Sequence, residues 1–67
     1  QNLTKRQREI YDYIVSVIKN KGYQPTMREI GTAFGLSSPA TAKQHIDALI
    51  KKGYLKKDGR DLVPLKD

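Results

Sequence analysis

Apolar residues recur every three or four positions in three segments of the chain, at about residues 5–21, 27–34 and 39–52. Residues at this spacing share one face of an α-helix, so the pattern predicts three amphipathic helices. The expected inward faces are Ile10, Ile14, Val17 and Ile18, bordered by Tyr11 or Tyr13; then Ile30, Ala33 and Phe34; then Ala42, Ile46, Leu49 and Ile50.

Each predicted helix also has a start signal and a stop signal. Thr26 and Glu29 form the clearest capping box, in which each side chain bonds to the backbone amide of the other residue. Thr4 and Gln7 have the same spacing at the first helix. Ser38 precedes the third helix, and we expect its hydroxyl to accept a bond from a first-turn amide. The three helices end at glycines, namely Gly22, Gly35 and Gly53.

One glycine falls inside a predicted helix. Gly31 costs the second helix about 1 kcal/mol relative to alanine. The close approach of a neighbouring helix is one reason for a glycine at this position.

The periodicity changes after Gly53. Two short runs with apolar residues flank Asp58-Gly59-Arg60, which indicates a β-hairpin at about residues 54–65. Pro64 cannot donate a ladder hydrogen bond, so its strand is expected at an edge. Core-facing candidates in this hairpin are Leu55, Val63 and Leu65.

The second and third helices are joined by Gly35-Leu36-Ser37 alone. Two helices joined by a short turn that contains glycine form the helix-turn-helix pattern. The predicted fold is mainly α with a small β-hairpin, a three-helix winged helix-turn-helix in a single domain of residues 1–67.

The amino-acid composition restricts the classes of function that are open to the chain. Thirteen Lys and Arg oppose seven Asp and Glu, a net charge of +6 that favours a polyanionic partner. No apolar run approaches the roughly 20 residues that span a bilayer, and no membrane partner is expected. The chain has no cysteine, and its single His45 is interpreted as structural. We therefore expect no catalytic residues, no metal site and no cofactor.

Three motifs stand out along the chain: P-T-x-R-E-I-G from Pro25, G-L-S-S-P from Gly35, and H-x-x-x-L-x-x-K-G from His45. Together they resemble the N-terminal domain of LexA repressors. The resemblance implies a bacterial, cytoplasmic, nucleoid-associated protein that binds operator DNA and represses DNA-damage (SOS) genes. Full-length relatives dimerise and cleave themselves through a C-terminal protease domain. This chain lacks that domain, so we expect no enzymatic activity and a monomer that binds an operator half-site, dimeric on DNA or through the missing domain.

The third helix carries the expected contacts to double-stranded DNA. Its first turns are expected in the major groove, where Gln44 can hold adenine and Lys43 can donate to guanine. Ser38 at the helix start suits a phosphate. By the resemblance, base and phosphate contacts fall to Ser38, Ala40, Thr41, Lys43 and Gln44, and backbone contacts fall to Lys51, Lys52, Lys56, Lys57 and Arg60.

Two alternatives stay open at this stage. Ala40 stands where the family often has Asn or Ser, and alanine offers a base only apolar contact, as with a thymine methyl. The chain can therefore be a stand-alone or phage regulator with a different operator. It can also be a protein-interaction winged helix that docks a partner helix against Ala40, Gln44 and Ala48.

Overall fold

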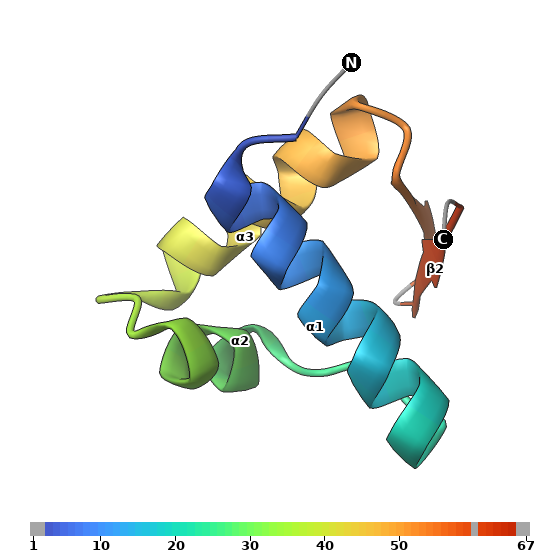
Figure 1. Cartoon of the computed structure of the whole chain (residues 1–67), viewed down its shortest axis with the longest axis horizontal. Coiled ribbons are helices and arrows are strands. Elements are labelled where there is room, and N and C mark those ends of the chain that lie inside the picture. The colour runs from blue at the N-terminus through green and yellow to red at the C-terminus, as the bar shows by residue number, and fades with distance from the viewer. Residues whose placement is uncertain (1–2, 60, 66–67) are drawn as a thin grey trace.

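A computed structural model of the chain describes residues 3–59 and 61–65 and consists of three helices followed by an antiparallel hairpin (Figure 1). The elements are α1 (Lys5–Lys21), α2 (Met27–Phe34), α3 (Pro39–Lys51), β1 (Leu55–Asp58) and β2 (Asp61–Pro64). This confirms the predicted fold class. The third helix ends one residue earlier than expected, because Lys52 is its C-cap and the chain turns left-handed at Gly53 (φ 84°).

Both predicted capping boxes are present. Thr4 Oγ1 accepts from the Gln7 amide at 3.2 Å, and the Thr4 amide donates to Gln7 Oε1 at 3.2 Å. At α2 the corresponding distances between Thr26 and Glu29 are 3.1 and 2.9 Å. These paired bonds fix where α1 and α2 begin and so set the entry of the chain into each helix.

The core forms where the three helices and the hairpin meet. Figure 1 shows α1 crossing in front of α3, with α2 beneath them and the hairpin at the right-hand edge. The buried hydrophobic residues of this core are Ile10, Tyr11, Ile14, Ile30, Ala42, Ile46, Leu49, Leu55 and Leu62. The inner face of α3 is thus held by side chains from every other element, which leaves its opposite face outward.

Of the two tyrosines expected at the border of the α1 stripe, Tyr13 is there, half-buried with its ring edge-on to Phe34. Tyr11 is instead in the core, 1% exposed, where its ring meets Tyr54 edge-on at 5.7 Å. The expectation for Ala33 of α2 was wrong. Ala33 is exposed, because Met27 and Phe34 pack beside Ile30 and complete the inner face of the short α2. Gly31 is buried, but a Cβ built there meets nothing within 4 Å, so no close helix approach explains it.

The register of the hairpin places other residues in the core than the sequence indicated. Asp58 pairs with Asp61, so the connection has two residues rather than the three of Asp58-Gly59-Arg60. A shift of one residue exchanges the faces of a strand. Leu62 therefore faces the core, and the predicted core residues Val63 and Leu65 are exposed.

Pro64 is accommodated by this register. The Leu65 amide donates to the Tyr54 carbonyl oxygen at 2.9 Å. Hydrogen-bonded and non-hydrogen-bonded pairs alternate along an antiparallel ladder, so the next pair, Leu55 with Pro64, requires no amide hydrogen from Pro64. The missing N–H of proline therefore costs the hairpin no bond.

Candidate nucleic-acid interface

The outer face of α3 brings several of the predicted site residues together. Ala40, Lys43, Gln44, Asp47 and Lys51 are exposed on α3, opposite the buried Ala42, Ile46 and Leu49. Thr41 is half-buried at the margin of this face. The Gln44 side chain makes no hydrogen bond to the described residues, so its carboxamide is available to an external partner.

The start of α3 differs from the prediction in the hydrogen bonding of the Ser38 side chain. Ser38 is the N-cap residue as expected, but its side chain makes no capping hydrogen bond. The Thr41 amide bonds instead to the Ser38 carbonyl oxygen at 3.2 Å, and Ser38 Oγ lies 3.4 Å from the Thr41 hydroxyl. The predicted bond from a first-turn amide to the Ser38 hydroxyl is therefore absent, and the Ser38 hydroxyl lies instead against the hydroxyl of Thr41.

Lys43 is held in an ion pair on the same helix. Its Nζ lies 3.1 Å from Asp47 Oδ2, one turn further along, and the two side chains are 65% and 58% exposed. Exposed pairs of this kind contribute only about 0.3–0.5 kcal/mol. The ammonium of Lys43 can therefore be withdrawn from Asp47 at little cost.

The hairpin lies beside α3 and shares a groove with it. Lys43 and Asp47 line this groove from α3, and Lys57 and Gly59 line it from the hairpin. Its apolar lining comes from Met27, Ile46, Ile50 and Leu62. The fold thus brings Lys57 and Lys43, which are far apart in the chain, to one surface.

A side-chain contact fixes the hairpin in this position. The Leu62 amide donates to Gln24 Oε1, in the loop between α1 and α2. Leu62 pairs with Lys57 in a non-hydrogen-bonded pair by the alternation above, so its amide points away from β1 and needs such an acceptor. Sequence reasoning assigned no role to Gln24, since no local spacing links it to the hairpin.

The five predicted backbone-contacting residues do not form one group. Lys51, Lys56 and Lys57 are exposed. Lys52 is half-buried, and its Nζ donates to Gln7 Oε1 at 2.9 Å, which ties the end of α3 to the start of α1. Arg60 lies outside the described residues.

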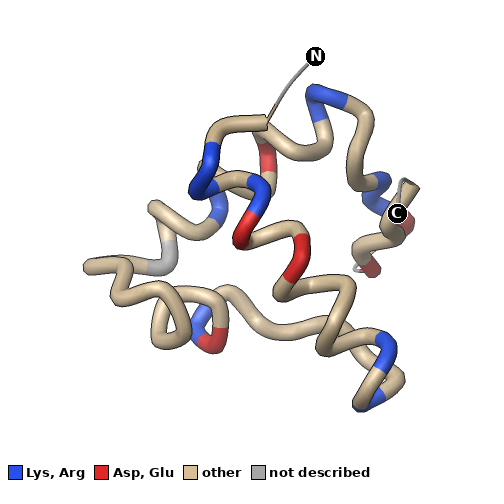
Figure 2. Tube along the Cα trace, in the orientation of Figure 1, with Lys and Arg blue, Asp and Glu red and all other residues tan. Residues whose placement is uncertain are grey.

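Positive charge is distributed over the whole molecule. Figure 2 shows Lys and Arg on the helices and on the hairpin rather than in a single cluster. In α1, the guanidinium of Arg6 lies 3.5 Å from Glu9 and 5.6 Å from the Phe34 ring centroid, and Arg8 lies 3.6 Å from Asp12. Arg6 and Arg8 are therefore each paired with a carboxylate of α1.

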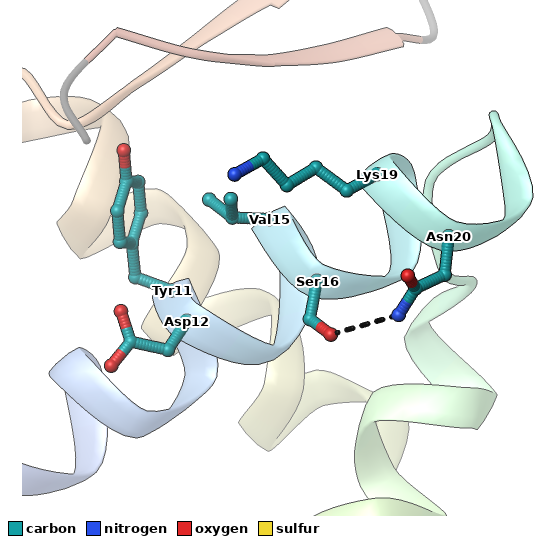
Figure 3. Close-up of a pocket in the computed structure, with 6 residues that line it drawn as sticks. All are labelled: Tyr11, Asp12, Val15, Ser16, Lys19 and Asn20. Atoms are coloured by element: carbon teal, nitrogen blue, oxygen red, sulfur yellow. Dashed lines mark hydrogen bonds between the residues drawn. The ribbon is translucent and has the colours of Figure 1, made fainter.

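A second depression lies on α1. Figure 3 shows Tyr11, Asp12, Val15, Ser16, Lys19 and Asn20 lining it, with Lys19 extended over Val15 and Asn20 donating to the Ser16 hydroxyl at 3.3 Å. All six residues belong to one helix, and none belongs to α3 or the hairpin. This depression is therefore separate from the candidate interface.

The described residues are neither grouped like metal ligands nor arranged as a membrane span. Within residues 3–59 and 61–65, no three His, Cys, Asp or Glu side chains are grouped so as to hold a metal ion. His45 is half-buried on α3. Over the same residues, every helix is too short or too polar to cross a bilayer.

The architecture defines the class of protein. Helices α2 and α3 with their short turn form a helix-turn-helix, and the β1–β2 hairpin after α3 forms the wing. The molecule is therefore a winged helix-turn-helix domain.

Comparison with known proteins gives the family. The model of the LexA DNA binding domain family matches residues 1–61. The LexA repressor of Staphylococcus haemolyticus (strain JCSC1435) is 55% identical over 58 residues, which are 87% of this chain and 28% of that protein. The LexA repressors of Staphylococcus epidermidis (strain RP62A) and Staphylococcus aureus (strain NCTC 8325 / PS 47) are each 52% identical over the same shares. The chain belongs to the LexA DNA-binding domain family, and it spans less than a third of the length of these relatives.

Proposed function

We propose that this domain recognises double-stranded DNA by sequence, with the first turns of α3 in the major groove. The observation that carries the proposal is the exposed polar face of α3, which stands beside a lysine-bearing hairpin and is braced from behind by the core. An α-helix fits the major groove of B-DNA, and side chains near its start can reach base edges.

Base reading is assigned to the first two turns of α3. Gln44 is exposed and can hold N6 and N7 of adenine with its carboxamide. Lys43 can donate to O6 or N7 of guanine once it leaves Asp47. Thr41 offers a hydroxyl at the edge of the face, and Ala40 offers a methyl group that suits the thymine methyl.

Phosphate contacts are assigned to the surroundings of this face. Ser38 stands at the start of α3, and its hydroxyl is not engaged with a first-turn amide. Lys51, Lys56, Lys57 and Arg60 supply positive charge that positions the domain without reading sequence. Lys52 adds positive charge at the end of α3, where its Nζ also donates to Gln7.

The biological role follows from the relatives, which are named LexA repressors. We infer that the chain is the DNA-binding module of a bacterial cytoplasmic repressor that controls DNA-damage (SOS) genes. The domain alone is then a monomer that binds an operator half-site, and two copies are held together on DNA or through a further domain. We expect no enzymatic activity from the residues of this chain.

The test is selection of bound duplexes from a randomised pool, followed by sequencing, at two salt concentrations. The expected result is an inverted-repeat motif whose half-site spacing gives the geometry of the paired domains. Salt-dependent binding without a motif would contradict sequence reading. Binding near background that does not change with salt concentration would instead favour the protein-interaction winged helix.

A further inference from the structure

A depression lies where α2 meets the start of α3, on the helix-turn-helix itself. It has a volume of about 290 Å³, and residues of both helices and of their turn line it. Its lining includes Arg28, Gly31, Thr32, Leu36, Ser37 and Ser38. Because Ser38 is the N-cap of α3, the depression adjoins the end of α3 that is proposed to enter the major groove.

The lining of this depression contains no acidic side chain among the described residues. By contrast, Asp47 lines the groove beside the hairpin, and Asp12 lines the depression on α1. A carboxylate repels a phosphate, whereas an unpaired cation attracts it. Of these three depressions, the one between α2 and α3 is therefore the best suited to an anion.

Arg28 is the cation of this depression, and it is exposed on the first turn of α2. It makes no ion pair or hydrogen bond to the described part of the chain, whereas Arg6 and Arg8 each pair with a carboxylate. The neighbouring carboxylate of Glu29 accepts the Thr26 amide at 2.9 Å. A guanidinium carries five donors in a planar fork that fits two phosphate oxygens, so Arg28 keeps its full capacity for such a ligand.

Hydroxyl groups and an open floor complete the depression. The Thr32 and Ser37 hydroxyls make no hydrogen bond to the described residues, and both side chains are exposed. A Cβ built on Gly31 meets nothing within 4 Å, so the glycine leaves the space in front of α2 open. Arginine and hydroxyl side chains are among the groups with which proteins contact the phosphates of DNA. The depression therefore has the donors and the room for one phosphate group.

We propose that Arg28 contacts DNA, and that the depression between α2 and α3 holds one phosphate of the duplex backbone. This inference rests on the proposed function, because the phosphate belongs to the duplex whose major groove receives α3. In helix-turn-helix complexes the first helix of the pair crosses the DNA backbone, which brings α2 close to phosphates. Arg28 then fixes the position of α3 over the bases without itself reading sequence.

The experiment measures the affinity of Arg28→Met for a random duplex and for the duplex selected from the pool, at several salt concentrations. Methionine keeps an unbranched side chain and removes the charge. We expect binding to both duplexes to weaken several-fold and the slope of log affinity against log salt to flatten by about one unit. The melting temperature of the variant should not fall, because Arg28 has no partner among the described residues.

Arg28→Lys separates the charge from the geometry of the contact. Lysine keeps the positive charge but replaces the planar fork with a single ammonium group. We expect this variant to keep the salt slope of the unaltered domain and to bind with an affinity between those of the unaltered domain and Arg28→Met.

Lys21→Met is the matched control for charge. Lys21 is the last residue of α1, is exposed and, like Arg28, makes no ion pair to the described residues. Figure 1 shows the end of α1 at the lower right, away from the start of α3 at the left. We expect Lys21→Met to leave the salt slope nearly unchanged.

Gly31→Leu tests the place of the phosphate without removing a charge. Leucine favours a helix, and its side chain can pack on Leu36 and Met27, which line the depression. The variant should therefore keep its thermal transition while its side chain fills the space. We expect it to bind both duplexes several-fold more weakly.

Each result decides the inference. An unchanged salt slope in Arg28→Met, with salt-dependent binding by the unaltered domain, would overturn it and leave the proposed function intact. Equal flattening in Lys21→Met would also overturn it, since net charge alone would then account for the loss. Full affinity of folded Gly31→Leu would place the phosphate outside the depression and overturn it as well. Failure of the unaltered domain to bind DNA in a salt-dependent way would overturn the proposed function together with this inference.

Discussion

The Nζ atom of Lys52 lies 2.9 Å from Oε1 of Gln7, and this contact joins the end of α3 to the first turn of α1. The same oxygen accepts the Thr4 amide at 3.2 Å, so one carboxamide serves both the cap of α1 and the packing of α3. Lys52 thereby supports the helix that carries the proposed interface, in addition to any contact with DNA.

Loss of this contact should destabilise the domain. Lys52→Met keeps an unbranched side chain and removes the donor, at an expected cost of roughly 1 kcal/mol for a part-buried hydrogen bond. For a domain of this size that corresponds to a fall in melting temperature of about 4–8 °C. Thermal unfolding followed by circular dichroism measures it. Lys51→Met removes the same charge from an exposed position and is the control; equal melting temperatures of the two variants would contradict the tie.

The wing should depend on Gln24 in a similar way. Gln24→Ala removes the acceptor of the Leu62 amide, which is on the side of β2 that faces away from β1. We expect faster hydrogen exchange at Leu62 and along the hairpin, together with a stability loss of about 1 kcal/mol. Gln44→Ala, at an exposed position on α3, serves as the control for exchange. Unchanged protection of the Leu62 amide in Gln24→Ala would count against this role.

Gly31 offers a stabilising substitution. It lies inside α2, and a Cβ placed on it meets nothing within 4 Å. Gly31→Ala should therefore raise the free energy of unfolding by about 0.5–1 kcal/mol, because alanine restricts the unfolded chain and favours the helix. Gly35→Ala is the contrasting variant, since Gly35 has a φ of 65° that L-residues rarely adopt, and it should destabilise the domain. Denaturant unfolding of both variants decides the matter, and a destabilised Gly31→Ala would show that the space is not open.

The comparison between sequence and structure separates local signals from tertiary ones. The capping boxes at Thr4 and Thr26 were predictable because both partners lie three residues apart, within one turn of helix. The outward face of α3 was predictable for the same reason, since one helical period fixes which residues share a side. The contacts between elements could not be predicted from the sequence, because no spacing rule connects Lys52 to Gln7, 45 residues away.

The hairpin shows how a small local ambiguity changes the packing. The sequence placed Asp58, Gly59 and Arg60 between the two runs, with Leu55, Val63 and Leu65 as core-facing candidates. The observed connection has two residues and pairs Leu55 with Pro64. Because side chains alternate along a strand, this register turns Leu62 inward and Val63 outward. In the observed register, Leu62 lines one groove together with Ile46 and Ile50 of α3.

Sequence reading should be concentrated at Gln44. Gln44→Ala is expected to reduce affinity for the selected duplex by about 1–3 kcal/mol and to relax the preference at one or two base pairs. Its affinity for random duplex should stay nearly constant, because the removed group carries no charge. Titration of both duplexes at one salt concentration provides the measurement. A similar loss on the two duplexes would show that Gln44 supports binding without reading a base.

Lys56 should contribute charge without sequence preference. It is exposed on β1, and a phosphate contact there releases about one counterion. Lys56→Ala should therefore weaken selected and random duplexes alike and flatten the slope of log affinity against log salt by about one unit. Lys19→Ala removes the same charge from α1, outside the proposed interface, and should leave the slope nearly unchanged. If both variants flatten the slope equally, the attraction arises from net charge, and the hairpin has no special place in the footprint. If only Lys56→Ala does so, the wing contacts the DNA backbone, because counterion release counts phosphates neutralised at the site of the substitution.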